Sequence, residues 1–501
     1  MEINDFEIAW LYILDSGRWI NKREELKVIA EELYKKTSVT EGVIRYFTME
    51  DLEERAKAGK KMKYKAVFKY KDEKIREILD LFYSSDMDNV DPEYLESLQI
   101  FRAKLTSFEI YLPNDRVEPV EVRVLFHNSG ILILEFWLKL KNMALTPEII
   151  NEIQLFPREE LNLTFNVPRK LLKDYAQINR DIADFLGNEP ETEENKMVKL
   201  ELTLHELVWM YWAVIAHIAT NQKAKTSTEL LHSLRYNAFR YFPVLIFNFP
   251  EISNPKELLE KYKRELYTML FQEIYLKPEH LRDDFVNTAF DDSNNLADRA
   301  DYLLYFSMES CLYIYTQQSQ SALEYISKKM EKTPEQLLTL EKLELILVLT
   351  LLNLRRFLLM IYDFLLSRRP ISEMETDELT GMRGILSKGV EEFYDLKLLV
   401  KTSSIKRLER GREFFEIDKA LEVIEKKLEL IDSAVSGIHN NLMEFLSVLL
   451  GILVQVGPII ALSIGEINPP IAATVAIIIF FGIYFLYKRI YRMWYRRRKF
   501  K

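Results

Sequence analysis

The stretch VEVRVLFHNSGILILEFWLKLK, residues 120–141, predicts the central element of the fold. On both sides of HNSG (127–130), apolar and polar side chains alternate, which is typical of a half-buried β-strand. HNSG itself is a plausible hairpin turn. SFEIYLP (107–113) before this stretch and LTFNVP (163–168) after it are also strand-like. Residues 96–169 are therefore predicted to be a strand-rich α/β region, and the chain to be an α+β protein.

The segment before this region shows mainly helical patterns. Residues 1–95 are interpreted as an N-terminal helical or α/β module. MEINDFEIAW, which opens the chain, has apolar residues spaced for an amphipathic helix. The one alternating run in this segment is KMKYKAVFKYK (61–71).

The segment after the strands is also predicted to be helical. Residues 170–370 form a helical domain in this interpretation, and aromatic-rich stretches such as RYNAFRYFPVLIFNF (235–249) supply its core faces. Two apolar stretches, 204–219 and 345–354, contain or are bounded by charged or titratable residues. We therefore expect both to be buried helices of a soluble domain, and not membrane spans.

Composition and charge exclude several classes of protein. The last fourteen residues, KRIYRMWYRRRKFK, contain eight basic residues and no acid; without them, 60 basic residues face 77 acids. A mostly acidic body argues against nucleic-acid binding. The single cysteine, Cys311, excludes an internal disulfide framework. No P-loop, GxGxxG or HExxH motif is present, and the six histidines lack ligand spacing, so neither an enzyme nor a structural zinc site is expected.

The C-terminal part of the chain contains two long uncharged runs. Residues 445–464 and 471–487 have the length and apolarity of membrane-spanning helices. The basic tail follows directly, with Tyr491, Trp494 and Tyr495 among its cations, as is typical of a cytoplasmic membrane boundary. Residues 444–501 are therefore predicted to be a transmembrane hairpin in the cell membrane, with both termini cytoplasmic. A buried soluble hairpin is the alternative.

A heptad repeat leads into the first of these runs. Residues 371–443 are predicted to be stalk helices. The positions that repeat with alternating spacings of four and three are Ile417, Leu421, Ile424, Leu428, Ile431, Val435, Ile438, Leu442, Phe445, Leu449, Ile452, Val456 and Ile459. An unbroken repeat of 3.5 residues is the signature of a coiled coil. It favours packing between copies of the chain, and one long helix that continues from the cytosol into the bilayer.

A second, polar stripe lies on the opposite side of this helix. Its members are Asn440, Glu444, Ser447, Gly451 and, approximately, Gln455. Polar side chains inside a membrane usually face water or a bundle interior, so these residues are pore-lining candidates. In the alternative, Asn440 and Glu444 lie at the headgroup boundary and Gln455 forms hydrogen bonds across helices.

The C-terminal part resembles the CorA-type divalent cation transporters. The resemblance rests on IDSAVSGIHNNLMEFLSVLLGIL at the junction of stalk and membrane and on the basic tail, and covers roughly residues 405–501. That family has a Gly-Met-Asn signature at the outer end of its first span. The corresponding stretch here is Gly465-Glu466-Ile467-Asn468, in which the Met is missing and one residue is extra.

The resemblance implies a homopentamer with the first spans around a pore, and hydrated Mg²⁺ or a similar ion as cargo. Gly465 and Asn468 correspond to the signature Gly and Asn. A ring of Asn468 amides could hold the water shell of Mg²⁺, and a ring of Glu466 carboxylates would concentrate cations at the mouth. In the alternative, Gly465, Pro469 and Pro470 only make a tight turn, which Asn468 caps.

An Asp- and Asn-rich stretch, residues 282–301, is a second candidate ion site. Asp291 and Asp292 could hold a hydrated divalent ion as a gating sensor. The stretch lacks the Gly and the terminal Glu of an EF-hand loop. A turn followed by a helix cap explains it as well.

Three functions follow from these patterns. The leading hypothesis is a CorA-like, homo-oligomeric channel or transporter for divalent cations, gated by its cytosolic domain. The second is a ligand-gated membrane effector of the antiviral-defence type on the same scaffold, with residues 170–370 sensing a small-molecule ligand. The third is a non-conducting membrane scaffold.

Overall fold

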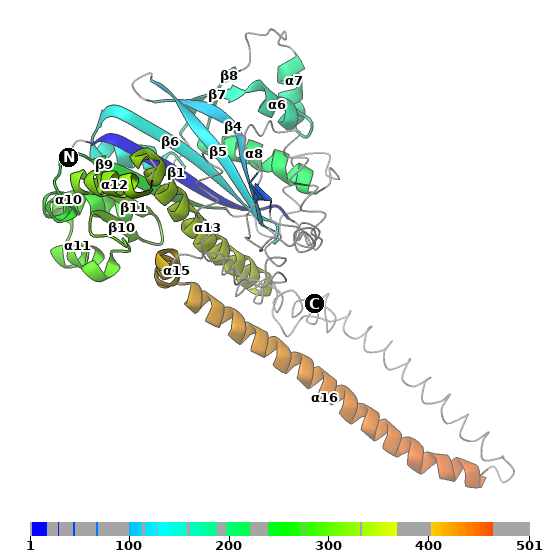
Figure 1. Ribbon diagram of the computed structural model, residues 1–501. Helices are drawn as coiled ribbons and strands as arrows, with labels where there is room; N and C mark the ends of the chain where they lie inside the picture. The colour runs from blue at the N-terminus through cyan, green and yellow to red at the C-terminus, as the bar shows by residue number, and fades with distance from the viewer. Residues whose placement is uncertain are drawn as a thin grey trace, which may run out of the picture. The chain divides into compact units, whose positions relative to one another are not determined.

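The computed structural model shows an α+β chain built on a large sheet (Figure 1). It describes residues 3–17, 29, 44–45, 67–68, 100–112, 116–127, 129–157, 161–187, 197–220, 239–273, 276–330, 333–367 and 402–463. The chain divides into two compact units, one formed by residues 1–368 and 386–425, the other by 369–385 and 426–501.

Nine strands of the first unit form one mixed sheet in the order β10-β11-β9-β1-β6-β5-β4-β7-β8. Their bounds are β1 (Ile3–Asp15), β4 (Ile100–Tyr111), β5 (Val117–His127), β6 (Ile131–Leu145), β7 (Leu163–Pro168), β8 (Met197–Leu202), β9 (Arg240–Phe249), β10 (Tyr302–Phe306) and β11 (Cys311–Thr316). Neighbouring strands are antiparallel except β11 and β9, which are parallel. Two short strands, β2 (Ile44–Arg45) and β3 (Val67–Phe68), form a separate pair.

The predicted hairpin is confirmed. β5 and β6 pair in antiparallel register from Val120 opposite Leu138 to Phe126 opposite Leu132. Gly130 closes the turn with a positive φ of 79°, a conformation that glycine adopts without strain, and its N–H donates to the carbonyl oxygen of His127. The strand expected at residues 163–168 is also confirmed, as β7.

The amphipathic helix expected at the start of the chain is wrong, because Ile3–Asp15 is the central strand β1. β1 pairs with β6 on one side and β9 on the other. Its even-numbered side chains from Phe6 to Leu14 enter one core layer, while Ala9, Leu11 and Ile13 are buried on the opposite face. A strand that is covered on both faces is apolar on both, so its period of two is hard to distinguish from a helical pattern.

The all-helical prediction for residues 170–370 is also wrong. This segment supplies β8, β9, β10 and β11, and the stretch that was expected to be a helical core face, 235–249, contains β9. β10 and β11 are short and buried at every residue. Short, fully apolar runs carry no periodicity that separates a strand from a helix.

Helices cover both faces of the sheet. One face packs against α5 (Pro147–Leu155), α6 (Arg169–Ala176), α8 (Leu204–Ala219) and α10 (Pro255–Leu270). α13 (Pro334–Ser367) lies on the other face, across β1, β6 and β9, with α12 (Gln317–Met330) and α15 (Thr402–Phe414) against it (Figure 1). The remaining elements are α7 (Arg180–Gly187), η2 (Pro278–His280), α11 (Asp283–Ala289), η3 (Asp292–Asn294) and α16 (Ile417–Ser463).

The two apolar stretches at 204–219 and 345–354 are buried helices, as expected. α8 begins at a capping box in which Thr203 Oγ1 accepts from the Glu206 N–H, and Thr203 N–H donates to Glu206 Oε2. The 345–354 part of α13 is mostly apolar and almost entirely buried, because the sheet and other helices enclose it. Within the described residues, only α13 has the length and apolarity of a membrane span, and 83% of that window is buried inside the protein.

Candidate functional site

The predicted polar stripe lies on one face of α16. This helix is continuous for 47 residues, from Ile417 to Ser463. Asn440, Glu444, Ser447 and Gly451 are all exposed on it. The Ser447 hydroxyl donates to the Met443 carbonyl oxygen at 2.8 Å, and a Cβ built on Gly451 would meet no other atom within 4 Å. Gln455 belongs to the same helix, but its side chain lies outside the described residues.

The opposite face of α16 carries the start of the heptad seam. Ile417, Leu421, Ile424 and Ile431 are buried within the single chain. In these first turns, therefore, the seam is covered by the chain itself. Beside the polar stripe, Met443 and Val448 are also exposed, so the described part of the stripe's face is both polar and apolar.

Three predicted residues of the loop between the spans, Gly465, Glu466 and Asn468, lie outside the described residues. The second apolar run and the basic tail do so as well.

Asp291 and Asp292 form a turn with a helix cap. Asp291 Oδ1 accepts from the Ser293 N–H at 2.9 Å and caps η3, and both aspartates are exposed. This hydrogen bond holds the pKa of Asp291 below its usual value. Among the described residues, no three His, Cys, Asp or Glu side chains come together in a way that could hold a metal ion.

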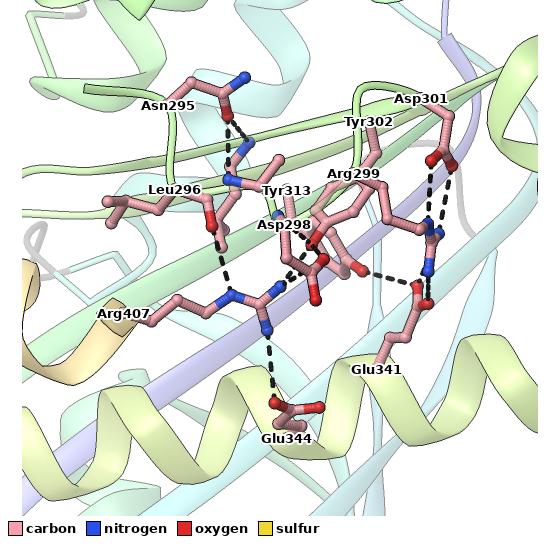
Figure 2. A network of polar contacts seen from close by, with 12 residues as sticks. Asn295, Leu296, Asp298, Arg299, Asp301, Tyr302, Tyr313, Glu341, Glu344 and Arg407 are labelled. Atoms are coloured by element: carbon pink, nitrogen blue, oxygen red, sulfur yellow. Dashed lines mark hydrogen bonds and ion pairs between the residues drawn. The ribbon is translucent and has the colours of Figure 1, made fainter. Parts of the chain in front are cut away.

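The same Asp-rich stretch contributes to a partly buried polar cluster that sequence reasoning missed (Figure 2). We call it the α15 network. Its members are Asp298, Arg299, Asp301, Tyr302, Tyr313, Glu341, Glu344 and Arg407. They come from the loop before β10, from β10 and β11, from α13 and from α15.

Arg299 forms one half of the α15 network. Its Nε and Nη2 donate to the two carboxylate oxygens of Asp301, at 2.8 and 3.1 Å. Nη1 forms a short ion pair with Glu341, which also accepts from the Tyr313 hydroxyl at 3.0 Å. Burial by itself would lower the pKa of Arg299, but its hydrogen bonds to Asp301 and Glu341 outweigh burial and raise it. The guanidinium group therefore stays charged inside the fold.

Arg407 of α15 forms the other half. Its Nη2 lies 3.0 Å from Asp298 Oδ1 and donates to the Tyr302 hydroxyl, which in turn donates to Asp298. Its Nη1 lies 3.6 Å from Glu344 Oε1, and its Nε donates to the Leu296 carbonyl oxygen at 3.3 Å (Figure 2). The Arg407 side chain is only 7% exposed, and that of Glu344 only 5%. One arginine thus holds α15 to both α13 and the loop before β10.

An elbow of two residues, Phe415 and Glu416, joins α15 to α16. Phe415 is fully buried, with its ring 5.2 Å from that of Phe242 on β9. Glu416 has a positive φ of 49°, which turns the chain between the two helices. At Gly411, four residues before Phe415, a Cβ would lie 2.3 Å from Leu352 Cδ1, so α15 approaches α13 closely. These contacts and the α15 network together set where α16 begins.

The α15 network is suited to transmitting movement between elements. Its charged groups meet partners of opposite charge or hydroxyl groups. Breaking the pair of Arg407 and Glu344, both of which are buried, is costly because it leaves a charge without a partner. A shift of the loop before β10 would therefore act on Arg407 and, through α15, on the elbow. Sequence reasoning could flag the Asp-rich stretch but not its partners, because Glu341, Glu344 and Arg407 lie 40 to 110 residues away in the chain.

The chain matches no known protein-family model, no curated protein and no solved structure.

Proposed function

We propose that the chain is a CorA-like, homo-oligomeric membrane channel for divalent cations, gated by its cytosolic sheet domain. The observation that carries this proposal is the continuity of α16. One helix begins at the elbow beside the α15 network and continues to Ser463, the last described residue, inside the first long apolar run. At about 1.5 Å per residue, its residues 445–463 cover roughly 28 Å, close to the roughly 30 Å thickness of a hydrocarbon core.

The polar stripe supplies the path for ions in this proposal. Asn440, Glu444 and Ser447 are exposed in the single chain, so their oxygens are available to face a water-filled axis when copies assemble. Mg²⁺ gives up its water shell reluctantly, and amide and hydroxyl oxygens can bind that shell without removing it. Glu444 carboxylates repeated around the axis would attract cations to the inner mouth.

The outer mouth is assigned to the loop between the two spans. Gly465 ends the first span, Asn468 contacts the hydrated ion, and Glu466 attracts cations. Both termini are cytoplasmic, and five copies surround the axis, as the resemblance to the CorA-type transporters implies.

Gating starts in the sheet domain in this proposal. The α15 network and the Phe415–Phe242 contact hold the first turn of α16 to the sheet. A change in the loop before β10 would move α15, and because α16 continues from the elbow without a break, the displacement would be passed along the helix toward the pore-lining stripe. This mechanism needs no chemical reaction.

Flux into proteoliposomes tests the proposal. Purified full-length chain is reconstituted, and Mg²⁺ entry is followed with a trapped indicator. The wild type should conduct, and Glu444→Gln with Asn440→Ala should lower the initial rate at least tenfold. Glu429→Gln is the matched control, because Glu429 is exposed on the same helix but lies in its charged part. Equal flux in the stripe variant and the control would show that the stripe does not line the path. The absence of flux from folded wild type would reject a channel.

A further inference from the structure

The nine-stranded sheet has two edges, which differ in how they are covered (Figure 1). At one edge, the loop before β10 pairs with that strand: the Leu296 N–H donates to the Leu304 carbonyl oxygen at 2.8 Å, and the Leu304 N–H donates to Asn295 Oδ1 at 3.1 Å. At the other edge, β8 pairs only with β7 within the part of the chain that the structure describes. Its outer side therefore presents N–H and C=O groups that can pair with a further strand.

β8 is a regular strand with two different faces. It contains no proline, and its register with β7 runs without a bulge over all six residues. Val198, Leu200 and Leu202 pack against the hydrophobic core, whereas Lys199 and Glu201 are exposed on the opposite face. Proline and bulges are two of the devices by which natural edge strands avoid pairing, and β8 has neither.

The two charged side chains of β8 are available to a partner. The Lys199 ammonium group lies 4.5 Å from the centre of the Tyr111 ring, on the exposed face of the sheet. Among the described residues, neither Lys199 nor Glu201 forms an ion pair. The edge thus carries one cation and one anion, two residues apart on the same face.

The order of residues in β8 is self-complementary for antiparallel pairing. If Leu200 lies opposite Leu200 of a second copy, each Lys199 lies opposite a Glu201, and each Val198 lies opposite a Leu202. A shift of two residues in either direction would instead place two lysines or two glutamates opposite one another. Like charges in directly opposed positions are unfavourable, so charge selects one register.

We infer that β8 joins two copies of the chain by antiparallel pairing across a two-fold axis at Leu200. The partner is a second copy because the pattern of charged and apolar residues in β8 complements itself. This inference goes beyond the proposed function, since a two-fold contact between sheet edges is separate from the packing of α16 around a pore axis. It would link two such assemblies, and it can be tested whether or not the chain conducts ions.

A disulfide at the two-fold axis tests the contact. Directly opposed residues of antiparallel strands have Cα atoms about 4.5–5.5 Å apart, which a disulfide can span. Leu200→Cys in the detergent-solubilised full-length chain should therefore form a covalent dimer on mild oxidation, measured on a non-reducing denaturing gel. The wild type gives the background, because its Cys311 is fully buried.

Leu202→Cys is the matched control, because Leu202 lies on the same strand and face and is half-buried like Leu200. In the inferred register the two copies of residue 202 are about 14 Å apart along the strands, too far for a disulfide. This variant should give at least tenfold less dimer than Leu200→Cys. Equal yields from the two variants, or no dimer from folded Leu200→Cys, would overturn the inference.

Charge exchange in the Leu200→Cys chain tests the register independently. Glu201→Lys places lysines opposite one another and should lower the yield of covalent dimer at least tenfold. Adding Lys199→Glu restores opposite charges across the pair and should bring the yield back to within about twofold of its original value. An unchanged yield with Glu201→Lys, or no recovery in a double variant that circular dichroism shows to be folded, would contradict pairing through β8.

Discussion

Arg407 shows how strongly a single buried charge depends on its surroundings. Its guanidinium meets Asp298, Glu344, the Tyr302 hydroxyl and a backbone carbonyl, while little of the side chain reaches water. Arg282 also forms an ion pair, with Asp284, but its side chain is 74% exposed. Water and salt screen the exposed pair, so the two arginines should contribute very differently to stability.

Arg407→Met should therefore lower the free energy of unfolding by about 3 kcal/mol, because Glu344 is left buried without a cation. Thermal and urea unfolding of the solubilised chain measure the loss. Arg282→Met, the control, should change stability by less than about 0.5 kcal/mol. Similar values for the two variants would contradict a structural role for the α15 network.

The Asp298 carboxylate should make the contribution of the α15 network to stability sensitive to acid. Burial raises the pKa of Asp298, but the Tyr302 hydroxyl and the charges of Arg407 and Arg299 outweigh burial and lower it. Because the pKa of Asp298 is lower in the folded state than in the unfolded state, its carboxylate stabilises the fold at pH values above the unfolded-state pKa. This stabilisation is lost as the pH falls through the folded-state pKa. Asp298→Asn should therefore be less stable than wild type at pH 7, and the difference should narrow below about pH 4. A difference in Tm that stays constant from pH 7 to pH 3 would contradict this.

At the scale of elements, the contact between α13 and α15 is close enough to exclude a methyl group. A Cβ at Gly411 would lie 2.3 Å from Leu352 Cδ1, and Leu352 is fully buried. Its side chain therefore cannot move aside without disturbing the core. Gly437 on α16 has no such close neighbour, because a Cβ built there would meet no other atom within 4 Å.

Gly411→Ala should destabilise the protein by up to about 2 kcal/mol: overpacking costs about 1–3 kcal/mol, and alanine regains about 1 kcal/mol of helix propensity. Gly437→Ala, the control, should stabilise it by about 0.5–1 kcal/mol. Adding Leu352→Ala should make Gly411→Ala favourable, and a double-mutant cycle by urea unfolding measures this coupling. Additive effects would show that the two residues are not in contact.

At the scale of the whole molecule, the sheet unites distant parts of the chain. β1 from the N-terminus lies between β6 and β9, which are separated by about a hundred residues of sequence. β1 must pair with both of these distant strands before the middle of the sheet is complete. β1 is also paired along both edges and covered on both faces, whereas α7 buries none of its residues.

Hydrogen exchange should reflect this difference. Backbone amides of β1 should exchange on the order of a hundredfold or more slowly than those of α7, because opening β1 requires disruption of the sheet. Mass spectrometry of peptides from the intact chain measures both. Comparable rates in the two elements would show that β1 is not part of the stable centre.

Patterns confined to one element could be predicted from the sequence. The 120–141 hairpin has alternating segments on both sides of a glycine turn, and residues 204–219 and 345–354 have long apolar helical patterns; all three form as expected. The long helix through residues 417–463 also forms where the heptad repeat predicts one. Such features depend on the order of polar and apolar residues within one short segment, and this order can be read from the sequence.

The tertiary structure decided the rest. The position of β1, the strand β9 and the short strands β10 and β11 depend on partners far away in the chain, and burial on both faces removes the alternation that identifies a strand. The α15 network depends likewise on three separate segments meeting at Arg407 and Arg299. The sequence by itself determined the 120–141 hairpin, the buried helices at 204–219 and 345–354, and the long helix at 417–463. Only packing decided that α16 begins at an elbow held by buried ion pairs, because an ion pair is specified by distance in space and not by spacing in sequence.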